Sequence, residues 1–202
     1  MSDRSAGSAQ AQDRSCDLLI VWHSRTGASR QLAHAALAGT RRAEQPPGGR
    51  DAQVTAEPAR PQAQPAPPML PRVRLLGCET TDAADLLGAR AYLFVCPENL
   101  ASMTGEMKAF FDRCYYPALD RLAGRAYAVI ISAGSDGHGA ARQIARIATG
   151  WRLRAVAEPM IVNLAAQTPE QILAPKTVPA ASLDAAADLA QGLAEAAALG
   201  VY

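Results

Sequence analysis

The sequence has little of several features that would mark a specialised class of protein. Aromatic residues make up 5% of its 202 residues, histidine occurs three times, and the formal net charge is only +1. A charge so close to zero gives no overall field that would attract nucleic acid or an anionic membrane. No window approaches the roughly 18 unbroken apolar residues that a membrane-spanning helix requires. These absences argue against a nucleic-acid partner and against a membrane span.

The start of the chain and its cysteines are also uninformative about export or metal binding. The stretch MSDRSAGSAQAQDRS lacks the apolar core of a signal peptide. The four cysteines, Cys16, Cys78, Cys96 and Cys114, have neither CxxC spacing nor the pattern of a ligand cluster, so no metal site is predicted. Cys96 ends an apolar run and Cys114 falls on an apolar helix face, which is typical of reduced core cysteines. Together these features predict a cytoplasmic protein.

Two segments do not resemble parts of a packed fold. We expect residues 1–16 to form a disordered leader. Residues 44–71, EQPPGGRDAQVTAEPARPQAQPAPPMLP, hold eight of the fourteen prolines and offer almost nothing to bury. Such a segment cannot offset the entropy that it would lose on ordering. We interpret residues 44–71 as a flexible Pro/Ala/Gln-rich insertion within a single domain that spans residues 17–202.

Short apolar runs alternate with helical patterns along the rest of the chain. Five such runs predict buried strands, at residues 17–23, 72–77, 90–97, 125–134 and 154–162. Helices are expected at residues 28–40, 81–87, 138–149 and 183–199, with residues 163–181 irregular. A further helix is expected to carry an apolar stripe made by Met103, Met107, Phe110, Phe111 and Cys114. Pro159 interrupts the fifth run, as suits an edge strand or a bulge. The alternation predicts an α/β fold with a doubly wound parallel sheet.

The loop after the first predicted strand, HSRTGASR, has the composition of a phosphate site. Backbone N–H groups at the start of a helix lack intrahelical acceptors and lie at the positive end of the helix dipole. Ser24, Thr26 and Ser29 add hydroxyl groups, and Gly27 allows the backbone to approach a ligand closely. Helix capping by Thr26 or Ser29 is the simpler alternative. The loop also has the H-C-x5-R spacing of a tyrosine phosphatase, but a serine at the cysteine position cannot supply the thiolate that this chemistry needs.

Two later loops point in the same direction. After the third predicted strand the chain reads CPENLASMTGEMKAFFDR, and after the fourth it reads SAGSDGHG. The first loop, HSRTGASR, is similar to the S-x-T-G-x-[ST] phosphate signature. Residues Pro97, Ser102, Met103, Met107, Lys108, Phe111 and Asp112 follow the pattern of a proline, a small-x-Met element and an xMK element that opens a helix ending near FxD. In these three loops the chain resembles the flavodoxin-like FMN proteins, most closely the NAD(P)H-dependent FMN reductase and quinone oxidoreductase branch that includes the tryptophan-repressor-binding-protein-like members.

The resemblance implies a flavodoxin-like strand order of 2-1-3-4-5, with FMN at the switch point between the first and third strands. It implies an oxidoreductase that transfers electrons from NAD(P)H to a quinone or a similar small acceptor, and it is compatible with a homodimer or homotetramer. No catalytic side chain is assigned, because the hydride chemistry belongs to the flavin. The residues implied to bind the cofactor are Ser24, Arg25, Thr26, Gly27, Ala28, Ser29, Pro97, Glu98, Asn99, Leu100, Ala101, Ser102, Met103, Ser132, Ala133, Gly134, Gly137 and His138.

Two other functions remain open on the sequence alone. A flavodoxin-type electron carrier without turnover of its own is one, although such carriers usually have an acidic face and this chain has a net charge of +1. A degenerate flavodoxin-fold interaction protein is the other, because Leu100 replaces the aromatic residue that relatives often place beside the flavin and Asp136 interrupts the glycine-rich loop. His138 is expected to be an exposed helix-start residue, and His23 a polar residue with its hydrogen bonds satisfied.

Overall fold

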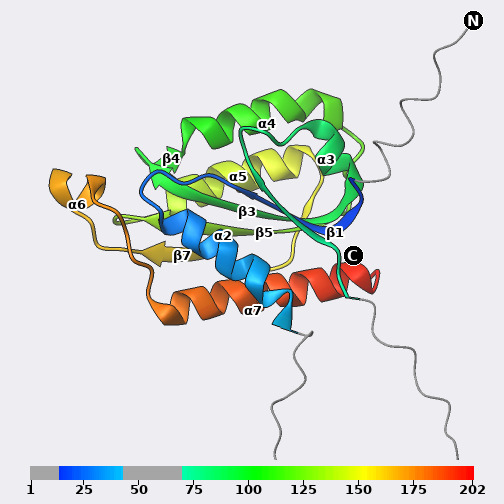
Figure 1. Cartoon of the computed structure of the whole chain (residues 1–202). Coiled ribbons are helices and arrows are strands. Elements are labelled where there is room, and N and C mark those ends of the chain that lie inside the picture. The colour runs from blue at the N-terminus through cyan, green and yellow to red at the C-terminus, as the bar shows by residue number, and fades with distance from the viewer. Residues whose placement is uncertain (1–13, 43–69) are drawn as a thin grey trace, which may run out of the picture.

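The computed structural model describes residues 14–42 and 70–202, and Figure 1 shows how their elements are arranged. The expected leader (1–16) and insertion (44–71) therefore lie almost wholly outside the described residues. The strands are β1 (Cys16–Trp22), β2 (Val73–Gly77), β3 (Ala89–Asn99), β4 (Ser102–Met103), β5 (Ala126–Ala133), β6 (Arg154–Ala155) and β7 (Met160–Asn163). The helices are α2 (Ala28–Gly39), α3 (Ala83–Gly88), α4 (Gly105–Ala118), α5 (His138–Gly150), α6 (Pro169–Leu173) and α7 (Ala180–Ala198).

The strands form a parallel sheet in the order β2-β1-β3-β5, with β6 and β7 both beside β5. This order confirms the predicted 2-1-3-4-5 arrangement, because β6 and β7 together make up the predicted fifth strand. Pro159 lies between these two short strands, at the edge of the sheet, where its missing N–H costs no central hydrogen bond. The short strand β4 pairs antiparallel with the end of β3 and makes a hairpin there.

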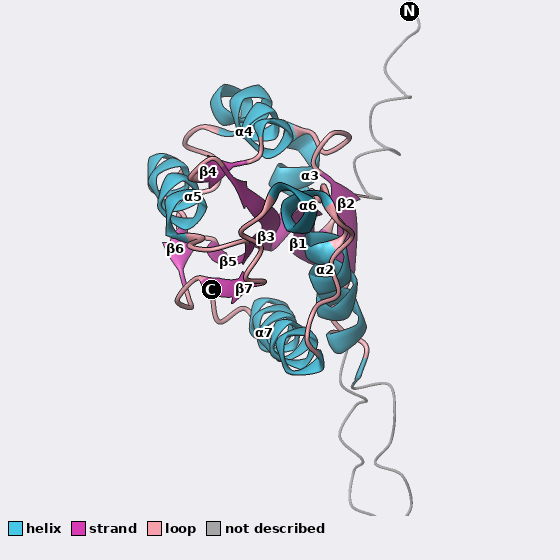
Figure 2. Ribbon diagram, turned by 90° about the vertical axis from the view of Figure 1, so that its left-hand side faces the viewer, coloured by secondary structure: helices cyan, strands magenta, loops and turns pink. Residues whose placement is uncertain are grey.

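Helices cover both faces of the sheet, as the two side-chain clusters and Figure 2 show. Alternate residues of β1 separate cleanly, with Leu18 and Ile20 packed under α2 and α7, and Leu19 and Val21 packed under α3, α4 and α5. The first face is rich in alanine, which allows α2 and α7 to lie close together. The second holds the large rings, among them Phe94, Phe110, Phe111 and Trp151.

Three local predictions need correction. Met103 lies in β4 rather than on the following helix, but its side chain is buried with that helix's apolar stripe, so the spacing of the stripe looked helical. The stretch predicted to be irregular, 163–181, contains the short helix α6. The last helix begins at Ala180, three residues before the expected start.

Within the described part of the chain, none of the helices is long and apolar enough to cross a membrane.

Candidate functional site

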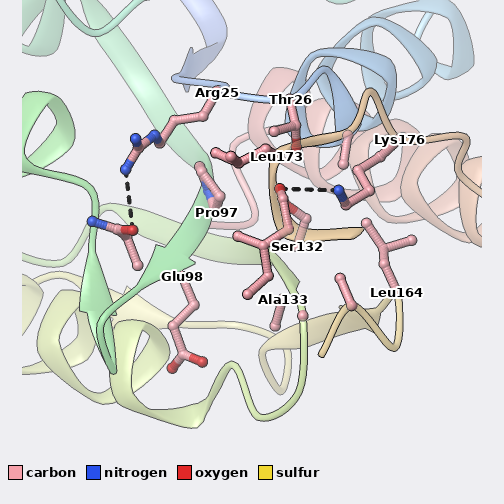
Figure 3. A pocket seen from close by; sticks show the side chains of 14 residues that line it. Arg25, Thr26, Pro97, Glu98, Ser132, Ala133, Leu164, Leu173 and Lys176 are labelled. Carbon is pink, nitrogen blue, oxygen red and sulfur yellow. Dashed lines mark hydrogen bonds between the residues drawn. The ribbon is translucent and has the colours of Figure 1, made fainter. Parts of the chain in front are cut away.

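A cavity of about 380 Å³ lies at the carboxyl ends of the central strands, the edge of the sheet where β1 and β3 send their helices to opposite faces. Ligands of open parallel sheets bind at such a switch point. Figure 3 shows side chains from four segments around the cavity. The lining residues are Arg25, Thr26, Ala28, Pro97, Glu98, Asn99, Ser132, Ala133, Gly134, Leu164, Ala166, Ile172, Leu173 and Lys176.

The N-terminus of α2 opens at this cavity. The N-cap residue Gly27 has a left-handed φ of 92° and makes no side-chain capping bond, while its own N–H donates to Ser24 Oγ at 3.1 Å. The first backbone bond into the helix runs from Gln31 N–H to the Gly27 carbonyl, at 3.1 Å. The N–H groups of residues 28–30 therefore have no intrahelical acceptor, and they lie at the positive end of the helix dipole. This is the arrangement that binds phosphate groups in many proteins.

The loop before α2 is held in place by contacts across the cavity. Ser29 is fully buried, and its hydroxyl is 2.8 Å from that of Ser132 at the end of β5. Arg25 Nη1 donates to Asn99 Oδ1 at 3.1 Å, across the mouth of the cavity (Figure 3). Arg25 has no carboxylate partner among the described residues. Its guanidinium is therefore available to an anion that enters between the two loops.

The N-terminus of α5 lies at the same edge, but it is already occupied by a side chain. The carboxylate of Glu98, from β3, accepts N–H bonds from Gly137 at 2.7 Å, Gly139 at 3.0 Å and Ala140 at 3.3 Å (Figure 3 shows the carboxylate). These bonds stabilise the negative charge of the carboxylate within the cavity wall. They also occupy these three N–H groups, which are therefore not free to donate to a ligand. His138, the first residue of α5, is exposed, as the simpler reading of this residue predicts.

The hairpin between β3 and β4 lines the cavity with Glu98 and Asn99, but not with its turn or with β4. Leu100 and Ala101 both have positive φ, 52° and 58°, which makes the two-residue connection of the hairpin. The Leu100 side chain is 93% exposed, so it gives no apolar cover to the cavity. Ser102 Oγ and the N–H of Met103 both bond to Gln143 Oε1 of α5, at 2.5 and 3.0 Å.

The sequence-predicted site residues thus divide into two groups. Most of those in the first loop, and those at the ends of β3 and β5, come together at the cavity or directly beside it, where Ser24 and Gly27 line a second hollow. Seven do not line either: Ser29, Leu100, Ala101, Ser102, Met103, Gly137 and His138.

One wall of the cavity was not expected from the sequence. It is formed by Leu164, Ala166, Ile172, Leu173 and Lys176, from the segment that connects β7 to α7 and includes α6. The capping box of α6, between Thr168 and Gln171 with Pro169 between them, is a recognisable start signal in the stretch TPEQ. That signal predicts a helix, but not which part of the molecule it covers.

This connecting segment is fastened to the first loop. The N–H of Lys176 donates to the Thr26 carbonyl at 2.9 Å, and Gln31 Nε2 donates to the Lys176 carbonyl at 2.6 Å. The Lys176 ammonium donates to carbonyl oxygens at the end of α6, those of Gln171, Ile172 (3.1 Å) and Ala174 (2.7 Å). The segment therefore closes the side of the cavity that the three predicted loops leave open.

His23, just before the first loop, differs from its predicted state. Its ring is buried, Nε2 lies 3.6 Å from Glu79 and 3.8 Å from Glu106, and Nδ1 has no hydrogen-bond partner in the described part of the chain. The expectation that its polar groups are satisfied is therefore wrong for one ring nitrogen.

The thiol groups near the site do not supply a nucleophile. Burial raises the pKa of Cys96, directly before Pro97, to about 12. Burial, followed by the charge of Glu79, raises the pKa of Cys78 to about 12 as well. Both thiols stay protonated at neutral pH, and only the thiolate is reactive. Both are core residues, which the sequence predicts for Cys96.

The strand order, the two helical layers and the cavity at the switch point define a flavodoxin-like α/β protein. Residues 78–169 match the model of a family described as NADPH-dependent FMN reductase. This match and the fold confirm the resemblance to flavodoxin-like FMN reductases predicted from the sequence. No curated protein sequence matches the chain.

Solved structures of the same fold include a rubredoxin oxygen:oxidoreductase from Desulfovibrio gigas, with 13% identity and a TM-score of 0.62. That match covers 95% of this chain but only 39% of the other, so this chain spans well under half of its length. A flavodoxin from the domain Archaea has 15% identity and a TM-score of 0.58, with 89% and 97% of the two chains covered. A WrbA-like flavodoxin from Agrobacterium tumefaciens has 14% identity and a TM-score of 0.55, with 91% and 98% covered.

Proposed function

We propose that the protein binds FMN and transfers electrons from NAD(P)H to a quinone or a similar small acceptor. The observation that carries the proposal is the N-terminus of α2, whose first N–H groups have no intrahelical acceptor and which opens on a cavity at the switch point of the sheet. The match to the FMN reductase family over residues 78–169 supports it independently, because that match does not include the α2 loop.

The residues of the cavity fit this cofactor. Its volume of about 380 Å³ lies within the range of about 300–1,000 Å³ that is usual for small-molecule sites. The N–H groups at the start of α2 and the Arg25 guanidinium would hold the phosphate, with the Ser24 hydroxyl directly beside the cavity. Pro97, Ala133, Leu164 and Leu173 offer apolar walls to a ring system, and Asn99 and Ser132 offer polar groups to its edge.

The charges around the cavity also suit a dianionic ligand. Glu98 is the carboxylate in its lining, and the three N–H bonds from α5 stabilise that negative charge locally. The Lys176 ammonium and the Arg25 guanidinium are cations in the same lining. A phosphate entering at α2 would therefore meet donors and positive charge.

The bound flavin would supply the hydride chemistry, accepting and then passing on electrons. The chain's own contribution is to hold the ring at one place and to exclude water from the side covered by Leu164 and Leu173. A cavity of about 380 Å³ has room for little beyond one cofactor, so donor and acceptor would use its open mouth in turn. No side chain is required for proton transfer in this proposal.

The test begins with the visible absorption spectrum of the purified protein, with and without added FMN. We expect a bound-flavin spectrum and quenching of FMN fluorescence at micromolar concentration, followed by NAD(P)H oxidation that depends on added quinone. A protein that stays colourless with unquenched FMN would contradict the proposal.

A flavodoxin-type electron carrier is the second candidate, and the coverage of whole flavodoxin chains by this fold favours it. Steady-state turnover with NAD(P)H and a quinone separates the two. An enzyme oxidises the nicotinamide continuously, whereas a carrier holds FMN without turnover of its own.

A further inference from the structure

A second hollow, of about 320 Å³, lies directly beside the proposed flavin site. It is bounded by Trp22 at the end of β1, by the first loop, by Arg30 of α2, and by Leu173 and Pro175 of the connecting segment. Arg25, Thr26 and Leu173 line both cavities, so the two are separated only by these residues (labelled in Figure 3). A group bound at the start of α2 could therefore extend into the second hollow.

The charges of this second hollow are unbalanced. Arg30 lies in the first turn of α2, where the helix dipole disfavours a cation, and this turn holds no acidic residue. Its guanidinium extends back over the loop, since a Cβ added at Gly27 would lie 3.9 Å from Arg30 Nη2. Within residues 14–42 and 70–202, neither Arg30 nor Arg25 forms an ion pair. Two unpaired arginines beside a positive helix end are an arrangement that an anion would stabilise.

The rest of the lining is apolar and partly aromatic. Trp22 is half-buried, and its ring makes an edge contact with His34, with ring centroids 6.0 Å apart. Leu173 and Pro175 line the hollow as well. A phosphate group alone would leave these surfaces without a partner, whereas a purine ring would cover them. The combination of guanidinium groups, an indole and an apolar wall fits a phosphorylated nucleoside.

We infer that the second hollow binds the adenosine phosphate part of a dinucleotide, with Arg30 holding a phosphate and Trp22 contacting the base. The inference rests on the proposed function, because it places this group next to the flavin site. Two dinucleotides carry the required chemistry. FAD would bring its adenylate from the flavin side, and NADPH would bring its 2′-phosphorylated adenosine from solvent.

The test compares Arg30→Gln with Arg41→Gln, which removes the same charge from an exposed arginine just beyond the other end of α2 and outside both cavities. In one arm, fluorescence quenching gives the dissociation constants of FMN and FAD for the flavin-free protein. In the other, calorimetry gives that of 2′,5′-ADP for the FMN-loaded protein, with adenosine as the phosphate-free comparison.

We expect Arg30→Gln to weaken binding of FAD or of 2′,5′-ADP about tenfold, the loss typical of one charged hydrogen bond, with FMN binding and all Arg41→Gln values unchanged. The ligand whose binding weakens identifies the dinucleotide, FAD for the first arm and NADPH for the second. Arg30→Lys keeps a positive charge and should restore part of the affinity. The inference is overturned if neither ligand depends on Arg30, or if FMN weakens as much as they do, since Arg30 would then hold the phosphate of FMN itself. Failure of the proposed function is a different result: wild-type protein that binds no FMN. In that case the 2′,5′-ADP titration on the flavin-free protein still decides the inference.

Discussion

Helices α2 and α5 begin at the same edge of the sheet, and the comparison of their first turns explains where a ligand can bind. Each has a glycine N-cap with a left-handed φ, 92° at Gly27 and 90° at Gly137, and neither N-cap makes a side-chain bond. At α5 the carboxylate of Glu98 accepts three of the free N–H groups. At α2 no carboxylate of the described residues does so, and two arginines lie nearby.

Within the described ranges, the presence of a carboxylate at the start of α5 and its absence from the start of α2 suggest different roles for two similar helix ends, one in stability and the other in ligand binding. Helix N-termini attract anions in general, so the sequence pattern of a glycine followed by a helix does not distinguish a ligand site from an internally satisfied one. In this protein the anion at α5 is part of the chain and fastens β3 to α5. An anion at α2 would have to come from outside the part of the chain that the structure describes. Substitutions at the two ends should accordingly affect stability at α5 and ligand affinity at α2.

The largest effect is expected from Gly139→Ala in the first turn of α5. A Cβ at this position would lie 2.1 Å from the carbonyl oxygen of Ala101, a backbone atom that cannot move without shifting the β3–β4 hairpin. We expect the free energy of unfolding to fall by about 3 kcal/mol, as for overpacked sites, measured by urea denaturation. Gly105→Ala, in the first turn of α4 with nothing within 4 Å, is the control and should cost little. Equal losses in the two variants would mean that the hairpin does not press on α5.

Glu98→Gln should have the next largest effect. The amide keeps the shape of the side chain but removes its charge and one acceptor oxygen, so N–H groups of α5 lose charged hydrogen bonds. The expected loss in the free energy of unfolding is about 2 kcal/mol. Glu195→Gln, at an exposed position in α7 whose side chain accepts a hydrogen bond from Gln191, controls for the loss of one carboxylate. A wild-type stability for Glu98→Gln would remove the basis of the comparison between the two helices.

Much of this fold follows from local patterns in the sequence. The five apolar runs and the helices between them predict the sheet, and parallel topology then brings the loops after β1, β3 and β5 to one edge. The loop containing Ser24 and Gly27 could be assigned to that edge because it follows a strand and begins a helix. The core roles of Cys96 and Trp151 follow from the same reasoning.

The contacts that these loops make with other parts of the molecule could not be predicted from local patterns. Glu98 contacts α5 because of the register between β3 and β5, and register is a tertiary property that no short stretch encodes. The connection at Leu100 and Ala101 takes positive φ, for which the sequence lacks the usual Asn or Gly. The segment from Leu164 to Lys176 has no apolar periodicity, so its position across the cavity depends on where α7 packs.

At α2, Gly27→Ala tests whether the free helix end serves a ligand. An alanine at a φ of 92° has a strained backbone, although the nearest atoms to its Cβ would be 3.9 Å away. The free energy of unfolding should therefore fall by about 1 kcal/mol. The dissociation constant of FMN, measured by fluorescence quenching, should rise about tenfold, because the N–H groups of the loop would turn out of place. Gly124→Ala is a matched control, with a φ of 81° and no atom within 4 Å in a turn far along the chain. It should lose similar stability and keep wild-type FMN affinity, and a parallel loss of affinity would show that backbone strain alone explains the change.

The smallest effect is expected at the N-terminus of a third helix, α3. There the anion is the side chain of the N-cap residue itself, Asp82. Asp82 accepts the Asp85 N–H at 3.0 Å and pairs with Arg14 at 2.7 Å. Partial burial raises the pKa of Asp82, but the Arg14 hydrogen bond and the backbone N–H bonds outweigh it and leave the pKa below its usual value. A lowered pKa in the folded state means that the stabilisation is present above about pH 4 and is lost as the pH falls through the folded value.

Asp82→Asn keeps a capping side chain and loses the charge, so its Tm should lie slightly below that of the wild type at pH 7. Because the pair with Arg14 is half-exposed, the difference should be no more than about 2 °C, and it should vanish near pH 2. If the difference in Tm persisted at low pH, the geometry of the Asp82 side chain rather than its charge would stabilise this helix end. The charge and the shape of the Glu98 side chain at α5 would then have to be tested separately.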